Sequence, residues 1–485
     1  MTTATPNTNA LIRGLGLIAA ISIVVGNVIG TGVFLKTRVM TCNVGTPSLV
    51  IAVWIGAGLL SLAGALTYAE LSAMMPKAGG EYVFVREAYG ARMGFLYGWM
   101  QFFIAKAGGL AAISIGFAIF LNALTNGALG GNYFTLDLHG YQFVLGKLQV
   151  VAVGMILFAT LINCAAVSVN GQVATLLMVI KVLLVLAVGI GAFIFAQGDW
   201  THFAQINAGG ACEGVNASAR VGLAGFGAAM LGALWAYNGW NELTFVAGEV
   251  RNPQRNIPLA LIGGMITVGA LYIFVNLAYF YVLTPTEIAS VPASSSVATE
   301  VARKFLGPLA VSLIAVALLA SSFGTLHIGV LTGARVPYAM SQHRLFFQNL
   351  ARLSPRTRVP VRALVVQALW ACILTISGSF DALTDYSIFG LWIFYGLVTA
   401  SVFIFRRKMP DAVRPYRTWG YPIVPALFLL VTAWLLGNTL WTTPRQAFAG
   451  LFLIALGLPV YHLWARHNRL TFGDEPVVAN KDVLS

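Results

Sequence analysis

The sequence predicts an all-helical polytopic membrane protein with twelve transmembrane helices. Of its 485 residues, 58% are apolar and 9% are charged, whereas soluble domains are about 45–50% apolar and about 25% charged. Stretches without any charged residue, such as 39–69 and 259–286, exceed the roughly 20 residues that a helix needs to cross the hydrocarbon core. The composition therefore excludes a string of soluble domains.

The distribution of basic residues predicts the orientation of the chain. Lys and Arg outnumber Asp and Glu by 29 to 16, and they gather in alternate loops, including the arginine-rich segment 344–362. Because cytoplasmic loops carry the excess of Lys and Arg, this pattern places both termini in the cytoplasm. We expect a multi-pass protein of the cell (inner) membrane, and no nucleic-acid partner, since aromatic residues do not interleave with the arginines at 358–362.

The first apolar segment and the four cysteines bear on whether the chain has a signal peptide, a metal site or a disulfide. The segment 15–35 is too long for a signal-peptide core, so we expect it to be retained as a helix. The four cysteines show no metal-ligand spacing, and no metal site is predicted. Cys42 and Cys212 both fall on the outer side, where a disulfide is conceivable, whereas Cys164 and Cys372 read as ordinary buried thiols.

Two apolar helices carry interruptions near the middle of the membrane. The first contains three glycines in the run 26–32, and the sixth contains the polar run 235–241. A glycine inside a helix costs about 1 kcal/mol relative to alanine, and asparagine at this depth needs partners. Close helix packing explains one such run, but a pair at matching positions is typical of a transporter with inverted repeats.

This interpretation divides the chain into repeats. Residues 11–200 are expected to form helices one to five, and residues 218–406 to form helices six to ten of the second, inverted repeat. Residues 420–466 add helices eleven and twelve. The polar ends, 1–10 and 474–485, are expected to be disordered and cytoplasmic.

Broken helices expose backbone groups that suit a zwitterion. The N–H groups at the start of the second half-helix, at Gly30, Thr31 and Gly32, attract a carboxylate. Carbonyl groups at the end of a first half-helix, such as those of Trp235 and Ala236, attract an ammonium group. The sequence therefore predicts binding of an α-amino acid, with its side chain directed toward Asn238, Trp235 and the third helix.

Lys181 is the charged residue that best fits a functional role. It lies mid-membrane in the fifth helix, where a charge costs about 2.5–3.5 kcal/mol on insertion scales. We expect its ammonium group to stand where a coupled sodium ion would otherwise bind, with the helix-eight hydroxyls of Ser321 and Ser322 as partners.

Five further ionisable residues have expected roles, and for four of them two interpretations remain open. Lys106 reaches the cavity or the polar face of helix ten, Glu242 meets a cationic substrate or stabilises a half-helix N-terminus, and His327 carries protons or packs. Arg335 is expected to anchor at the interface. Glu70 is expected to cap its helix or pair with the basic loop that follows.

The motifs resemble the amino acid–polyamine–organocation superfamily, specifically its L-amino acid transporter branch. They are GNVIGTGVF at 26–34, YAEL at 68–71 with PKAGGEY at 76–82, AYNGWN at 236–241 and NPQRNIP at 252–258. The resemblance implies a leucine-transporter-type fold of five plus five inverted helices and two more. It also implies that Gly30, Thr31 and Gly32 bind the substrate carboxylate, that Ile29 and Trp235 contact its amino group, and that Lys181 occupies the sodium position.

The resemblance completes the predicted site. Trp235 stands at the aromatic gate of the family, and Ala236, Asn238 and Asn241 complete the substrate-binding residues. Eukaryotic members of the family pair with a glycoprotein through a cysteine between helices three and four, and the segment 122–146 contains none. No disulfide-linked heavy chain is therefore expected.

These observations predict a sodium-independent exchanger of small or medium neutral L-amino acids that works by alternating access. The alternative is proton-coupled uptake of amino acids or polyamines, with Lys181 or Glu242 as the titrating group. A membrane enzyme or a channel is disfavoured, because the sequence has no His cluster, paired carboxylates, nucleophile motif or repeated filter. No cofactor and no catalytic residue are predicted.

Overall fold

The computed structural model describes residues 11–138, 141–207, 209–292, 295–377, 380–442 and 444–467. The terminal segments 1–10 and 474–485 that were expected to be disordered lie outside these residues. In the first half of the chain the elements are α1 (Leu17–Val28), α2 (Gly32–Val44), α3 (Pro47–Met74), α4 (Glu81–Tyr89), α5 (Ala91–Met100), η1 (Gln101–Lys106), α6 (Ala107–Leu124), β1 (Asn132–Leu138), β2 (Tyr141–Gly146), α7 (Lys147–Asn163), α8 (Val167–Phe195), η2 (Trp200–Ala204) and η3 (Ala217–Ala219).

The second half of the chain begins with another interrupted helix. Its elements are α9 (Gly222–Ala236), α10 (Glu242–Phe245), η4 (Ala247–Glu249), α11 (Pro253–Val282), α12 (Pro285–Ser290), α13 (Val297–Leu306), α14 (Leu309–Gly333), α15 (Arg335–Gln342), η5 (Gln348–Ala351), α16 (Val361–Ser377), α17 (Phe380–Lys408), α18 (Ile423–Thr442), α19 (Pro444–Ala455) and α20 (Gly457–His467).

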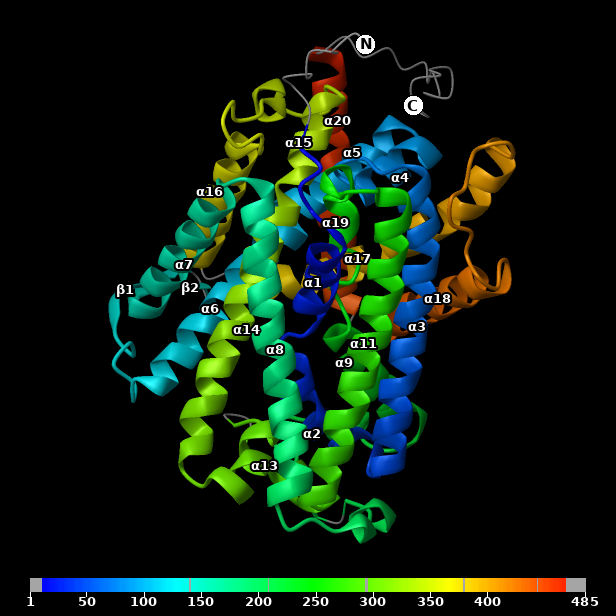
Figure 1. Ribbon diagram of the computed structural model, residues 1–485. Helices are drawn as coiled ribbons and strands as arrows, with labels where there is room; N and C mark the ends of the chain where they lie inside the picture. Colours follow the sequence, from blue (N-terminus) through cyan, green and yellow to red (C-terminus); the bar gives the residue numbers. More distant parts are fainter. Residues whose placement is uncertain are drawn as a thin grey trace.

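The long helices form one bundle of membrane length. Among the described residues, nine helical runs are long and apolar enough to cross a membrane, and α7, α9 and α16 are shorter apolar helices. In Figure 1, α4, α5 and α15 lie at one end of the bundle, while α2 and α13 lie toward the other. We refer to these as the α4 end and the α13 end. The predicted polytopic membrane architecture is confirmed.

One part of the fold is not helical, which corrects the all-α prediction. Strands β1 and β2 pair antiparallel in the connection between α6 and α7, with Asn132 opposite Gly146 and Leu138 opposite Tyr141. The hairpin projects from the side of the bundle in Figure 1. The segment is rich in aromatic and branched residues such as Tyr133, Phe134 and Thr135, a composition that favours strands.

Local sequence explains where several helices begin and end. Thr46 precedes α3, and its side-chain oxygen accepts the Leu49 N–H, while Pro47 occupies the first helical position. Helix α2 ends at Val44, and Gly45, which follows it, caps the helix with a left-handed φ of 75°. These signals make α2 and α3 two separate helices joined by a short turn.

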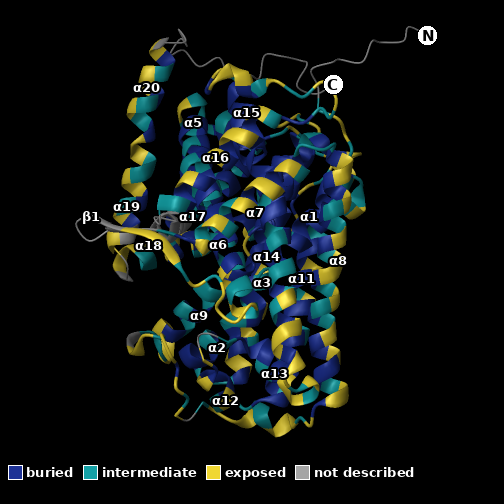
Figure 2. Ribbon diagram, turned by 90° about the vertical axis from the view of Figure 1, so that its left-hand side faces the viewer, coloured by how far each residue is buried: buried dark blue, intermediate teal, exposed yellow. Residues whose placement is uncertain are grey.

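The core lies where α1 and α3 pack against α11. Helix α11 contacts α1, α3 and α8 along much of its length. The rings of Trp54, Tyr237 and Tyr272 form an aromatic cluster there, with centroids 5.0–5.8 Å apart. Figure 2 shows this buried interior, with exposed residues along the outward faces of α8 and α20. The helices of the core therefore hold the two interrupted helices in place.

A disulfide joins the two regions of chain that lie at the α13 end. Cys42, in the last turn of α2, is bonded to Cys212, in the segment before α9. The Asn43 carbonyl also accepts the Val221 N–H over 2.6 Å. The pairing that the sequence left open is therefore present in the structure.

Candidate functional site

The first predicted break lies between α1 and α2. Helix α1 ends at Val28, and Ile29 leaves helical geometry with ψ of 86°. The Gly30 N–H turns back to the Val28 carbonyl over 2.7 Å, and α2 begins at Gly32. Because the first N–H groups of a helix have no acceptor inside it, those of Thr31 and Gly32 are available to a ligand. The run 26–32 is therefore an interrupted helix, as the sequence predicts.

The second predicted break separates α9 from α10. Helix α9 ends at Ala236 and α10 begins at Glu242. Gly239 adopts a φ of 105°, which a residue with a side chain rarely adopts. The Asn238 N–H bonds back to the Trp235 carbonyl over 3.1 Å. The chain therefore turns sharply between the two half-helices.

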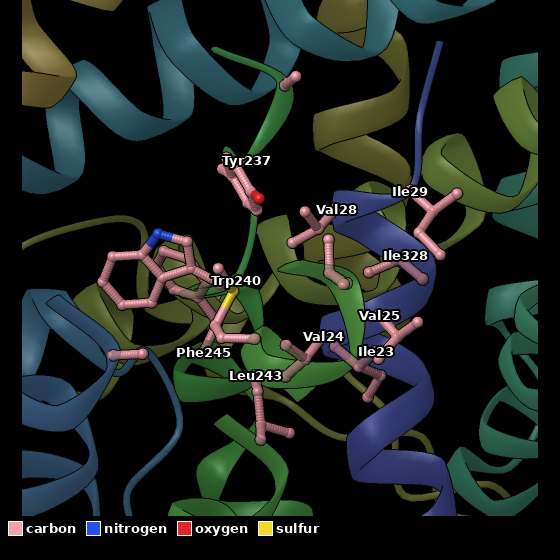
Figure 3. Packing of buried hydrophobic residues seen from close by; sticks show 14 of the residues in the cluster. Ile23, Val24, Val25, Val28, Ile29, Tyr237, Trp240, Leu243, Phe245 and Ile328 are labelled. Carbon is pink, nitrogen blue, oxygen red and sulfur yellow. The ribbon is translucent and has the colours of Figure 1, made fainter. Parts of the chain in front are cut away.

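The two breaks lie side by side. A Cβ atom added to Gly32 would lie 2.6 Å from the Ala236 Cβ atom, so only glycine fits at this approach. The Asn27 amide donates to the Gly239 carbonyl over 3.2 Å. The Tyr272 hydroxyl of α11 lies 2.8 Å from the Val28 carbonyl oxygen and 3.1 Å from that of Ala236. Figure 3 shows the apolar residues packed around the two breaks.

A cavity of about 370 Å³ lies at these breaks, which is within the usual range for small-molecule sites. Its walls come from the two breaks, η1 with α6, α14 and α17. Most of the predicted site residues line it: Gly30, Thr31, Gly32, Trp235, Ala236, Asn238, Asn241 and Ser322. The structure therefore brings together residues that are far apart in the sequence.

Three predicted site residues stand behind the cavity wall. Ile29 is fully buried, and its carbonyl oxygen accepts the Ser321 hydroxyl over 3.2 Å. Lys181 is 1% exposed, and its Nζ atom donates to the Gly26 carbonyl over 2.5 Å and to the Thr325 hydroxyl over 3.0 Å. The predicted hydroxyl partners Ser321 and Ser322 are therefore wrong. Thr325, one turn further along α14, holds the ammonium group.

Polar contacts on the α17 side complete the site. The Tyr395 hydroxyl donates to the Asn238 side-chain oxygen over 2.9 Å and lies 3.4 Å from that of Asn241. The Asn241 amide donates to Glu81 over 2.5 Å. Sequence patterns did not select Tyr395, because an isolated tyrosine in an apolar helix gives no signal of its partner.

Lys106 and Glu242 form an ion pair at the edge of the cavity, and the Thr332 hydroxyl donates to the second oxygen of Glu242. Lys106 therefore pairs with Glu242 on α10, the second half of the interrupted sixth span, and not with the polar face of the predicted tenth span, which is α17. His327 is buried between Asn163 and Asn170, with ring-nitrogen contacts of 3.1 and 3.3 Å. Of the two roles considered for His327, carrying protons or packing, these contacts support packing.

Two other charged residues correct the sequence interpretation. Arg335 is not an interfacial anchor, because it is fully buried and binds both carboxylate oxygens of Glu249 over 2.8 and 2.9 Å. Glu70 does not pair with the loop that follows it, and instead binds Arg406 and Arg414 from the distant end of α17 and beyond. In both pairs a buried charge finds a partner that is remote in sequence.

A second cavity of about 810 Å³ adjoins the first from the α2 side. Trp235, Asn238, Leu391 and Tyr395 line both cavities. Trp235 is 43% exposed, and the Lys36 Nζ atom lies 4.8 Å from the centroid of its ring. Trp235 therefore stands between the two spaces. Within the described residues, no group of three potential metal ligands is found.

Interrupted helices that meet at a cavity inside a bundle of membrane-length helices define a secondary transporter. The chain belongs to the amino acid permease family, whose profile matches residues 15–460. It is therefore a membrane transporter of amino acids and not an enzyme, and the resemblance to the amino acid–polyamine–organocation superfamily is confirmed.

The chain is similar to named transporters over nearly its whole length. It is 32% identical to the serine/threonine exchanger SteT of Bacillus subtilis over 456 residues, covering 94% of this chain and 97% of that protein. It is 30% identical to the human b(0,+)-type amino acid transporter 1, covering 95% and 90%. It is also 30% identical to the rabbit (Oryctolagus cuniculus) large neutral amino acids transporter small subunit 2, covering 96% and 83%.

Proposed function

We propose that this protein exchanges neutral L-amino acids across the membrane by alternating access, without sodium. The observation that carries the proposal is the meeting of two helix breaks at one cavity of about 370 Å³. An α-amino acid presents one carboxylate and one ammonium group, which match the exposed N–H and C=O groups of such breaks. Similarity to a protein named as an exchanger supports exchange over one-way uptake.

The backbone of the breaks positions the substrate. The N–H groups of Thr31 and Gly32, at the start of α2, bind the carboxylate, and Gly30, whose own N–H bonds to the Val28 carbonyl, lets the ligand approach the backbone closely. The carbonyl groups of Trp235 and Ala236, at the end of α9, accept from the ammonium group, since each carbonyl oxygen offers two acceptor sites. In this proposal Ile29 contributes through its backbone.

The polar side of the cavity receives the side chain of the substrate. Asn238 and Asn241 line the cavity there, and both lie within reach of the Tyr395 hydroxyl. These amide groups can bond to a hydroxyl or accommodate a small apolar group, which suits small or medium neutral amino acids.

Lys181 supports independence from sodium. Its ammonium group lies against the Gly26 carbonyl of α1 and the Thr325 hydroxyl of α14. Oxygen atoms of this kind are the ligands that a hard cation needs. Here the ammonium group of Lys181 takes the place of such a cation, so α1 and α14 stay bridged whether or not substrate is bound. Ser321 holds the neighbouring Ile29 carbonyl, and Ser322 faces the cavity.

Trp235 acts as the gate in this proposal. It separates the cavity at the breaks from the larger cavity beside α2, so a change in its side-chain rotamer connects or divides the two. Closing one side before the other opens is the requirement for alternating access.

The proposed topology has twelve spans with both termini in the cytoplasm of a cell (inner) membrane. Within the part of the chain that the structure describes, nine runs have the length to span alone, and α7, α9 and α16 complete the twelve. Segments 11–200 and 218–406 are the two inverted repeats, followed by 420–466. The basic segment 344–362 lies after α15 at the α4 end, which is therefore the cytoplasmic end. The cysteine-free segment 122–146 supports transport without a disulfide-linked heavy chain.

Transport by the purified protein in proteoliposomes tests this proposal. Labelled L-serine is expected to enter only when the vesicles contain unlabelled amino acid, at equal rates in sodium and potassium buffers. Competition by each of the twenty amino acids then defines the substrates. Uptake into empty vesicles, or a requirement for sodium, would contradict the proposal. Accumulation driven by a pH gradient would instead support the alternative, proton-coupled uptake of amino acids or polyamines.

A further inference from the structure

The cavity contains a charged pair that the backbone mechanism does not use. Among its described lining residues, Lys106 and Glu242 are the only members that are Lys, Arg, Asp or Glu. They form an ion pair, and each side chain is 11% exposed. The pair therefore borders the substrate space instead of being sealed in the protein.

The surroundings hold both groups at the cavity. Lys106 is the last residue of η1, a π-helical turn between α5 and α6, and such turns are frequent at functional sites. Its Nζ atom lies 4.6 Å from the centroid of the Phe245 ring. Glu242 begins α10, and its second oxygen accepts the Thr332 hydroxyl. Glu242 would therefore keep its place if Lys106 lost its charge.

We propose that Lys106 determines substrate selectivity by neutralising Glu242, which would otherwise recognise a cationic side chain. This inference rests on the proposed function and identifies the residues that exclude charged substrates. With both groups ionised, the pair adds no net charge to the cavity, so a neutral side chain meets no unpaired charge. A lysine-like substrate would have to displace Lys106 from Glu242, and a glutamate-like substrate would have to displace Glu242 from Lys106.

Removal of either partner leaves a charge that only the opposite charge can satisfy. An unpaired buried charge is unfavourable unless it gains a partner, and a charged substrate side chain can supply one. Glu81 strengthens the effect of removing Lys106. It is fully buried behind Asn241, so loss of the lysine leaves two carboxyl groups on this side of the cavity. Lys106→Met is therefore expected to favour cationic amino acids, and Glu242→Gln to favour acidic ones.

Exchange in proteoliposomes loaded with L-serine tests the proposal, with external labelled L-serine, L-lysine or L-glutamate. The ratio of L-lysine to L-serine uptake is expected to rise about tenfold or more in Lys106→Met, since charge-assisted hydrogen bonds are about twice as strong as neutral ones. In Glu242→Gln the L-glutamate ratio is expected to rise instead. The double variant Lys106→Met/Glu242→Gln should show neither gain. Lys147→Met, at an exposed lysine outside the cavity, is the matched control.

Two measurements separate the possible failures. If the wild-type protein does not exchange L-serine, the proposed function is wrong. If it does, and Lys106→Met exchanges L-serine with an unchanged L-lysine ratio, the selectivity proposal is wrong. For a variant that folds but does not transport, the rise in melting temperature that L-lysine produces in detergent tests the selectivity proposal. L-Lysine is expected to stabilise Lys106→Met more than wild type, and equal stabilisation of the two would overturn the proposal.

Discussion

The buried pair of Arg335 and Glu249 gives the sharpest test of how this fold is held together. The two side chains are 0% and 1% exposed and share two hydrogen bonds of 2.8 and 2.9 Å. The third guanidinium nitrogen donates to the Leu331 carbonyl over 2.6 Å. Arg335→Met leaves the Glu249 carboxylate without its partner, at a cost of about 3–5 kcal/mol. About 1.4 kcal/mol corresponds to a factor of ten in rate. If the whole cost lowers the barrier to unfolding, Arg335→Met should therefore unfold at least about 100-fold faster than wild type.

The rate of unfolding in detergent at one elevated temperature, followed by tryptophan fluorescence, measures this effect. The double variant Arg335→Met/Glu249→Gln should unfold more slowly than Arg335→Met, because it leaves no unpaired charge. Arg303→Met is the matched control, since Arg303 pairs with Glu300 at 3.2 Å with 49% of its side chain exposed. Such pairs contribute about 0.2–1 kcal/mol. Equal unfolding rates for Arg335→Met and Arg303→Met would refute the argument.

Three further predictions follow from separate features. Gly32→Ala should abolish exchange and lower the melting temperature, because its Cβ atom would lie 2.6 Å from the Ala236 Cβ atom; transport at the wild-type rate would contradict this close approach. Cys42→Ser should destabilise the protein by about 2–4 kcal/mol and make it insensitive to reductant, whereas wild type should lose a similar amount when the bond to Cys212 is reduced. Burial in α4, outside the membrane-spanning helices, raises the pKa of Glu81 to about 7. The folded protein then keeps a proton that the unfolded chain loses, so stability falls as the pH rises from about 5 to about 8, and Glu81→Gln should remove this slope in melting temperature.

The sequence predicts the membrane architecture and the two breaks well because both depend on local composition. A missing charge over a whole span and a glycine cluster inside it are visible without any knowledge of neighbours. The partners of buried charges are different. Lys181 bonds to Thr325 and not to Ser321, although both lie on α14 one turn apart. A choice between them depends on helix rotation and packing, which no short pattern encodes.

Long-range pairs show the same limit. Glu70 was expected to pair nearby, yet its partners Arg406 and Arg414 follow it by more than three hundred residues. The β-hairpin was missed because a short connection between membrane helices gives a weak alternating pattern. Local rules thus predicted the helices and the positions of the breaks, while tertiary packing decided which polar groups meet.

The link between Cys42 and Cys212 has a mechanical consequence for transport. It connects the last turn of α2 to the chain that leads into α9, and the bond from the Val221 N–H to the Asn43 carbonyl lies beside it. Both half-helices on this side are therefore tethered at their far ends as well as touching at Gly32 and Ala236. We expect them to tilt together as a single lever, so that one movement of this lever opens or covers the bound molecule.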